Sequence, residues 1–133
     1  MKKLFIILLS LIPVFAFADL GGGQRADNFK YTSTSDIVDT TAVEIGAAKT
    51  GRKYCVTGIT VSNTDTSVTT IVNLLDGTTP IWHCPATANG GGCVVPFDPP
   101  VCGTSNTALK VEAVTTSAQV RVSVKGRLAL DGE

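Results

Sequence analysis

The sequence has few of the residues on which catalytic and metal sites usually depend. Its 133 residues include one histidine, one tryptophan and one methionine. It contains no Gly-x-Ser-x-Gly elbow, His-Glu-x-x-His pair or phosphate-binding glycine loop, and a single histidine excludes a histidine dyad. The acidic residues are scattered, and the spacing of a pair such as Asp76 and Asp98 does not favour glycoside hydrolysis. The sequence therefore predicts a protein that is not an enzyme and has no cofactor.

An excess of charge of one sign is also lacking. The precursor has a formal net charge of zero, with eleven basic and eleven acidic residues. Removal of an N-terminal segment containing Lys2 and Lys3 leaves nine basic residues against eleven acidic ones, a net charge of about −2. We therefore expect neither a nucleic acid nor an anionic membrane as partner. Basic residues on alternating strand positions are usually the solvated face of a sheet, and those that could form a local patch are Arg52, Lys53, Lys110, Arg121, Lys125 and Arg127.

The only long apolar run lies at the N-terminus. Lys2 and Lys3 precede it, and Ala16-Phe17-Ala18 has the small-x-small pattern of a signal peptidase site. A helix needs about 20 apolar residues to span a bilayer, and this run is shorter. A signal sequence that stays uncleaved and anchors the chain in the membrane is therefore the weaker alternative. We predict a signal peptide over residues 1–18 and an exported mature chain that begins at Asp19, in the periplasm or outside the cell and without a membrane segment.

Residues 19–35 contain little material for a core. They include Gly21-Gly22-Gly23 and a polar run that ends at Ser35. This composition predicts a flexible arm rich in Gly, Ser and Thr, either without a role or exchanged between subunits. The remaining residues, 36–133, are of ordinary size for one domain.

Strand signals fill this domain. Residues 53–62, 68–75 and 79–84 are rich in β-branched and aromatic side chains, with a tight turn at Asp76-Gly77. Pro80 is expected at the start of a strand or on a sheet edge, because it cannot donate a ladder hydrogen bond.

Two further segments, 109–113 and 120–125, alternate apolar and polar residues and predict a C-terminal antiparallel hairpin. Between them and the earlier strands, Asp98 to Gly103 contains two adjacent prolines and is expected to be an irregular crossing outside any sheet. The pattern as a whole predicts an all-β fold, an antiparallel β-sandwich or jelly-roll of about seven or eight short strands.

Four cysteines accompany the export signal, and exported thiols are normally oxidised. Of the three pairings, we favour Cys84 with Cys93, which closes a local glycine-rich loop, and Cys55 with Cys102, a longer-range link. The alternative is a zinc site built from His83 and three of the thiols. No C-x-x-C knuckle is present, so we expect no metal.

Trp82 and Tyr54 combine an apolar body with a polar handle on presumed core strands. If exposed, they could form a platform for a sugar or a protein, together with the loop that contains Asn89. Core packing is the competing interpretation and carries more weight, because the domain has few aromatic residues for its core.

Several short motifs follow one another in a recognisable order. The chain resembles small β-sandwich modules of bacteriophage virion proteins over residues 54–127, through Ile59-Thr60-Val61-Ser62-Asn63, Leu74-Leu75-Asp76-Gly77-Thr78, Gly103-Thr104-Ser105-Asn106-Thr107-Ala108-Leu109-Lys110-Val111 and Val120-Arg121-Val122-Ser123-Val124-Lys125-Gly126. The signal peptide and the four cysteines depart from what most structural proteins of tailed phages carry, and they favour an exported product.

The resemblance implies a structural or surface-interaction module on a virion or a filament, which acts through protein partners or self-association. The alternative is a secreted recognition domain that binds carbohydrate or a cell-surface protein through Trp82, Tyr54 and the Asn89 loop.

Overall fold

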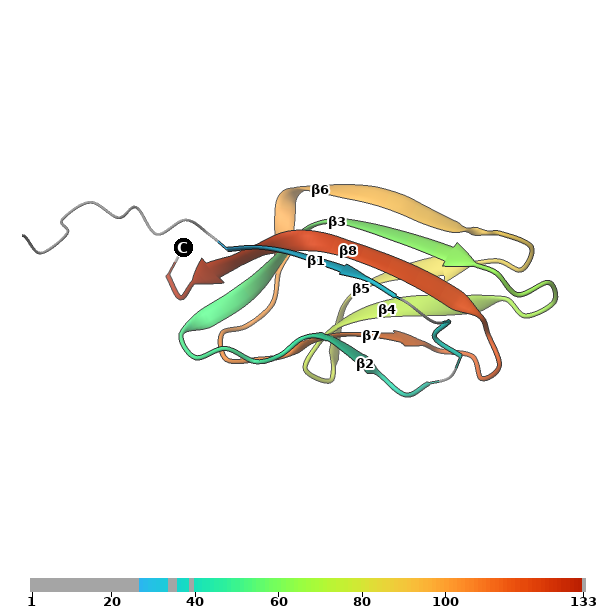
Figure 1. The fold of residues 1–133 in the computed structure, drawn as a ribbon, viewed down its shortest axis with the longest axis horizontal. Helices are drawn as coiled ribbons and strands as arrows, with labels where there is room; N and C mark the ends of the chain where they lie inside the picture. The colour runs from blue at the N-terminus through green and yellow to red at the C-terminus, as the bar shows by residue number, and fades with distance from the viewer. Residues whose placement is uncertain (1–26, 34–35, 39, 133) are drawn as a thin grey trace, which may run out of the picture.

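A computed structural model describes residues 27–33, 36–38 and 40–132. These residues form eight strands and no helix, and the strands are β1 (Asp27–Thr32), β2 (Val43–Gly46), β3 (Arg52–Asn63), β4 (Thr70–Asp76), β5 (Thr79–Ala86), β6 (Gly92–Cys102), β7 (Leu109–Ala113) and β8 (Val120–Leu130). They build two four-stranded sheets stacked face to face (Figure 1). We call β1-β8-β3-β6 sheet A and β2-β7-β4-β5 sheet B.

The pairing of the strands identifies the sandwich as a jelly roll. Antiparallel ladders join β1 with β8, β2 with β7, β3 with β6 and β4 with β5. This is the pattern of one long antiparallel ribbon rolled up so that its strands alternate between two sheets. Further ladders, β3 with β8 and β4 with β7, join the rolled ribbon into two continuous sheets. The predicted all-β class is confirmed.

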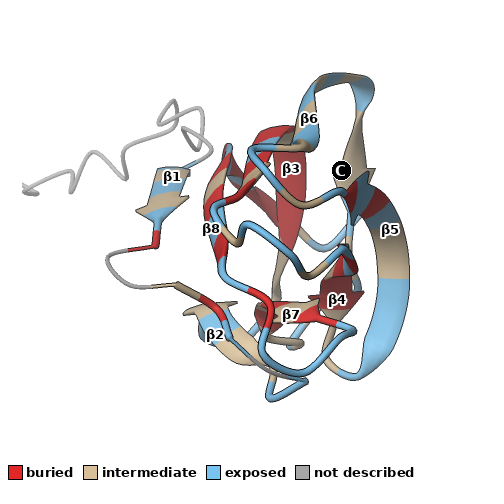
Figure 2. Ribbon diagram, turned by 90° about the vertical axis from the view of Figure 1, so that its right-hand side faces the viewer, coloured by how far each residue is buried: buried red, intermediate tan, exposed pale blue. Residues whose placement is uncertain are grey.

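The core lies between the sheets because the strands alternate as the sequence predicts. On β8, Val120, Val122 and Val124 are buried, whereas Arg121 and Lys125 are exposed. Figure 2 shows that the buried residues gather on the central strands β3, β8, β4 and β7, whereas β5 and β6 are largely exposed or half-buried. The core is mostly aliphatic, as expected for a chain with few aromatics.

A bulge in β3 keeps its side chains in register with this core. The pairing of β3 with both β6 and β8 shifts between Val56 and Gly58. Tyr54 and Val56 face the core before the shift, and Ile59 and Val61 face it afterwards. One extra residue moves the inward positions from even to odd numbers, since side chains alternate with a period of two.

Three expectations from the sequence are wrong. Part of the expected flexible arm, Asp27–Thr32, forms strand β1 and pairs with β8, and the rest of the arm and the expected signal peptide lie outside the described residues. The expected C-terminal hairpin does not form, because β7 belongs to sheet B and β8 to sheet A. An alternating pattern predicts that each segment is a half-buried strand, but it does not predict that the two strands share a sheet. Here the residues between β7 and β8 cross from sheet B to sheet A.

The third wrong expectation is the irregular crossing at Asp98 to Gly103. Strand β6 continues to Cys102, through a cis Asp98–Pro99 bond and Pro100. The prolines are tolerated because β6 is an edge strand and because they lie where its register with β3 shifts, between the pairs Gly58–Pro96 and Val56–Val101. Pro80 lies near the start of the edge strand β5, as predicted.

Candidate interaction surfaces

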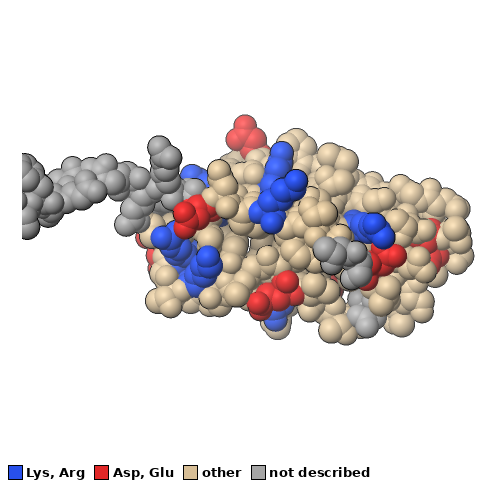
Figure 3. All heavy atoms as spheres, in the orientation of Figure 1, with Lys and Arg blue, Asp and Glu red and all other residues tan. Residues whose placement is uncertain are grey.

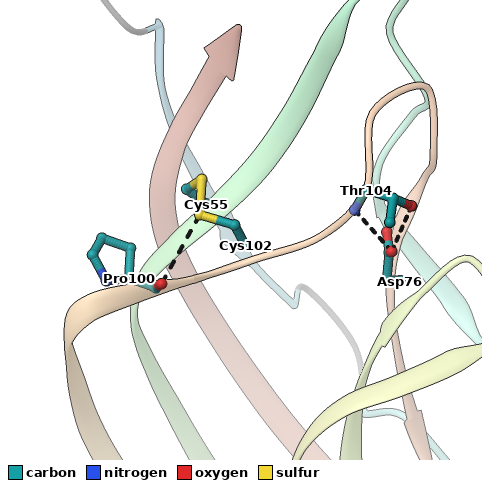
Figure 4. Close-up of a disulfide and its surroundings, with 5 residues drawn as sticks. All are labelled: Cys55, Asp76, Pro100, Cys102 and Thr104. Atoms are coloured by element: carbon teal, nitrogen blue, oxygen red, sulfur yellow. Dashed lines mark hydrogen bonds between the residues drawn. A yellow bond between two sulfur atoms is a disulfide. The ribbon is translucent and has the colours of Figure 1, made fainter. Parts of the chain in front are cut away.

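Both predicted disulfides are present, and they play different structural roles. Cys55 and Cys102 lie directly opposite each other on β3 and β6 of sheet A, with 4.0 Å between their Cα atoms (Figure 4). Cys84 of β5 and Cys93 of β6 are 6.5 Å apart at Cα and join the edge of sheet B to the edge of sheet A. No free cysteine occurs among the described residues, so the zinc alternative loses its thiolate ligands.

Tyr54 belongs to the core and not to a surface platform. Tyr54 is 5% exposed, and its hydroxyl donates a 2.8 Å hydrogen bond to the carbonyl of Ala47. Its ring meets that of Phe29 edge to face at 5.1 Å. Burial raises the pKa of the Tyr54 hydroxyl, and the negative charge of Glu44 raises it further. The competing interpretation from the sequence, core packing, therefore describes this residue.

Trp82 and Asn89 lie in separate places. Trp82 is half-buried on β5, and its ring meets Phe97 of β6 edge to face at 5.5 Å. This contact packs the two sheets together beside the Cys84–Cys93 disulfide. Asn89 is exposed in the loop between β5 and β6, where it adopts a φ of 61° and donates a backbone hydrogen bond to Asp65. With Tyr54 buried, the three residues do not form a common platform.

The two acidic residues considered for glycoside hydrolysis have separate environments. Asp76 accepts hydrogen bonds from the backbone N–H of Thr104 at 2.8 Å and from its hydroxyl at 2.7 Å (Figure 4). It therefore holds the loop that leads into β7. Asp98 is exposed in the irregular part of β6.

The outer face of sheet A contains a hollow that the sequence does not reveal. It has a volume of about 300 Å³, and its floor is formed by Gly58 and Thr60 of β3. Lys30 and Lys125 line it on one side, and Val94, which is 76% exposed, lines it on the side of β6. A second hollow of about 190 Å³ adjoins it, because Thr60 and Ser123 line both. Hydroxyl groups and cations thus share one shallow surface.

The register of β1 and β8 explains why sequence reasoning missed this surface. Lys30 stands directly opposite Lys125, yet Lys30 lies in the segment expected to be a flexible arm. The alternation of their strand marks Lys125 and Arg121 as candidates for a basic patch. Only the pairing of the first strand with the last brings Lys30 beside Lys125.

The four edge strands differ sharply in proline content. The edges formed by β5 and β6 contain Pro80, Pro85, Pro96, Pro99 and Pro100, all the prolines that follow the expected signal peptide. The edges formed by β1 and β2 contain none. Proline cannot donate to a neighbouring strand, so it protects an edge from pairing with another chain. The β5–β6 side of the sandwich is protected in this way, and the β1–β2 side is not.

The fold and these surfaces define an all-β jelly-roll protein cross-linked by two disulfides. Comparisons with known protein families and with curated proteins find no match to the chain. The part of the chain that the structure describes contains no helix long and apolar enough to cross a membrane.

Proposed function

We propose that the chain is an exported, non-enzymatic structural or surface-interaction protein that assembles through the open edge of its sandwich. The surface of a phage virion or a filament is the setting that the sequence resemblance favours. Two disulfides fit an oxidising, exported environment. The observation that carries the proposal is the proline asymmetry of the edges, with every proline after residue 13 on β5 or β6.

The outer edge of β1 is the part of this side best suited to pairing. The backbone N–H of Ser33, next to the strand, donates to the carbonyl of Val122 at 2.9 Å. Because donors alternate along an antiparallel strand, the N–H groups that face away from β8 are those of Asn28, Lys30 and Thr32. No strand of the described chain covers them. A second copy that pairs its own β1 here would extend sheet A across a two-fold axis.

A proline at position 28 tests this pairing. Asn28 is exposed, and its N–H faces away from β8, so Asn28→Pro removes an outward donor and leaves the ladder to β8 intact. We expect the oxidised wild-type protein to be a stable oligomer by size-exclusion chromatography with light scattering, and Asn28→Pro to be a monomer. Asn28→Ala is the matched control and is expected to remain oligomeric. A monomeric wild type, or an oligomer that Asn28→Pro leaves unchanged, would reject assembly through β1.

Recognition of carbohydrate is the second candidate function. The observation that favours it is the hollow on the outer face of sheet A, which offers hydroxyl groups beside cations. This surface replaces the expected Trp82, Tyr54 and Asn89 platform. Retention of the wild-type protein on a panel of neutral and acidic polysaccharides tests it, and the absence of retention on all of them would reject it.

A further inference from the structure

Lys30 and Lys125 form a like-charge pair on the outer face of sheet A, at its β1 side. They are direct partners across the β1–β8 ladder, and both side chains are exposed. Side chains opposite each other in an antiparallel pair have Cβ atoms about 4.5–5.5 Å apart, and like charges in this position are destabilising. The two lysines of this pair can bring their ammonium groups to one anion.

No carboxylate relieves this repulsion within the described part of the chain. The ion pairs found there join Arg52 with Asp27 and Arg121 with Asp36, and neither includes Lys30 or Lys125. In Figure 3, one group of Lys and Arg atoms lies near the middle of the view with no Asp or Glu atoms against it. Arg121 lines the adjoining hollow but is paired with Asp36, so the two lysines provide the unneutralised positive charge of the hollow of about 300 Å³.

The backbone of β3 makes room for the hollow and for one of its lysines. A Cβ added to Gly58 would come within 2.7 Å of Cε of Lys125, so the lysine stem lies over the glycine. Beside it, Thr60 contributes a hydroxyl group that can donate to or accept from a ligand, and the Ser123 hydroxyl, which donates to the carbonyl of Tyr31 at 3.3 Å, can still accept. The hollow therefore combines two convergent cations with neutral hydrogen-bonding groups.

The geometry points to a binding site for a carboxylate or sulfate group of an acidic polysaccharide, held between Lys30 and Lys125. We infer this ligand class from the charge, the hydroxyl lining and the volume of about 300 Å³, at the small end of ligand sites. The inference rests on the recognition function given above as the second candidate, and not on self-association. Nucleic acid fits less well, because no aromatic side chain lines the hollow to stack a base.

Binding measurements on a pair of charge-matched variants test the site. The probes are polygalacturonate, dextran sulfate, neutral dextran and a duplex DNA of comparable charge. We expect the wild type to bind at least one acidic polysaccharide in a salt-dependent way, and Lys30→Gln/Lys125→Gln to bind it at least tenfold more weakly. Lys49→Gln removes the same kind of exposed charge at another place in the chain and is expected to stay within twofold of the wild type.

Two further readouts separate loss of the site from loss of the fold. Lys30→Gln/Lys125→Gln removes a repulsion, so its melting temperature without ligand should equal or exceed that of the wild type, and Lys30→Arg/Lys125→Arg should restore binding. The acidic polysaccharide should raise the melting temperature of the wild type and not that of the glutamine variant.

The alternative results overturn the inference in distinguishable ways. Equal affinity of the glutamine variant and the wild type for polysaccharide would reject the site and leave the recognition function standing. If neutral dextran bound as tightly as the acidic polysaccharides, the site would also be rejected and the recognition function would stand. If duplex DNA bound as tightly as the polysaccharides, the surface would be a general polyanion surface and not a polysaccharide site. No binding to any polysaccharide would reject the site and the recognition function together.

Discussion

Asn63 is the residue on which one end of the sandwich depends. It is fully buried at the end of β3, and its side-chain amide donates to the carbonyls of Val68 at 2.7 Å and Ala86 at 2.9 Å. Its side-chain oxygen accepts a 3.0 Å hydrogen bond from the N–H of Asp65. One side chain thus joins the end of sheet A, the loop before β4 and the end of β5. A buried polar residue is tolerated here because all of these groups are paired.

Asn63→Ala is predicted to destabilise the oxidised protein by about 2–4 kcal/mol, because it removes the amide that donates to the buried carbonyl of Ala86 and to the partly buried carbonyl of Val68. The measurement is the free energy of unfolding in urea for the wild type and the variant. Gln119→Ala is the control, since Gln119 carries the same amide group at an exposed position, and it should change stability by less than about 0.5 kcal/mol. Similar effects of the two substitutions would contradict the role of Asn63.

The next turn-forming residue, Asp65, shows a different kind of local control. Its carboxylate accepts backbone hydrogen bonds from Ser67 at 2.7 Å and Val68 at 2.8 Å. These bonds, with that from the Ser67 hydroxyl, lower the pKa of Asp65 below its usual value despite the opposing effect of burial. The loop between β3 and β4 therefore has a defined turn, held by a carboxylate two residues after Asn63.

At the scale of elements, the two disulfides stabilise different parts of the roll. Cys55–Cys102 joins partners within sheet A that are 47 residues apart in the chain. Cys84–Cys93 joins β5 to β6 across only nine residues, where the chain passes from sheet B to sheet A. Each disulfide removes conformational entropy from the unfolded chain, and this effect grows with the logarithm of the number of residues in the loop that the bond closes.

Double alanine substitutions should separate these contributions. Loop closure predicts a loss of roughly 4 kcal/mol for Cys55→Ala/Cys102→Ala and roughly 3 kcal/mol for Cys84→Ala/Cys93→Ala. Chemical unfolding of both variants and the wild type without reductant provides the comparison. A larger loss for the short-range pair would mean that attachment of β5 to β6, rather than loop length, sets the stability.

Element type and element partnership have different origins in this fold. Alternation on residues 109–113 and 120–125 correctly predicted strands, because the inward residues must be apolar whichever sheet receives them. The same alternation could not reveal that β7 pairs with β2 and β4 while β8 pairs with β1 and β3. Two adjacent prolines predicted the end of a sheet, and instead they lie within an edge strand whose register shifts around them.

At the scale of the whole molecule, the first and last strands close the roll. The pairing of β1 with β8 joins residues about 100 positions apart and makes part of the expected arm, Asp27–Thr32, the edge of sheet A. This closure contributes to both surfaces on which the proposals rest. The outer edge of β1 is open to another strand, and its outward face brings Lys30 to Lys125.

The intact mass of the purified protein tests both the predicted signal-peptide cleavage and the two disulfides. We predict a chain that begins at Asp19 and gains about 4 Da on reduction, as expected for two disulfides. Mass spectrometry with and without reductant, under denaturing conditions, provides the measurement. A chain that retains residues 1–18 would contradict the predicted cleavage, and an unchanged mass on reduction would contradict the disulfides.

The sequence by itself determined the all-β class and most of the strands, and it favoured the disulfide pairing that the structure shows. These features depend on local signals, namely side-chain alternation, turn residues and the preference for one short cysteine loop. Only the tertiary structure decided the jelly-roll order, the burial of Tyr54, the strand at residues 27–32 and the lysine pair. Each of these depends on contacts between distant segments, and strand alternation specifies which face is buried without specifying the neighbour that covers it.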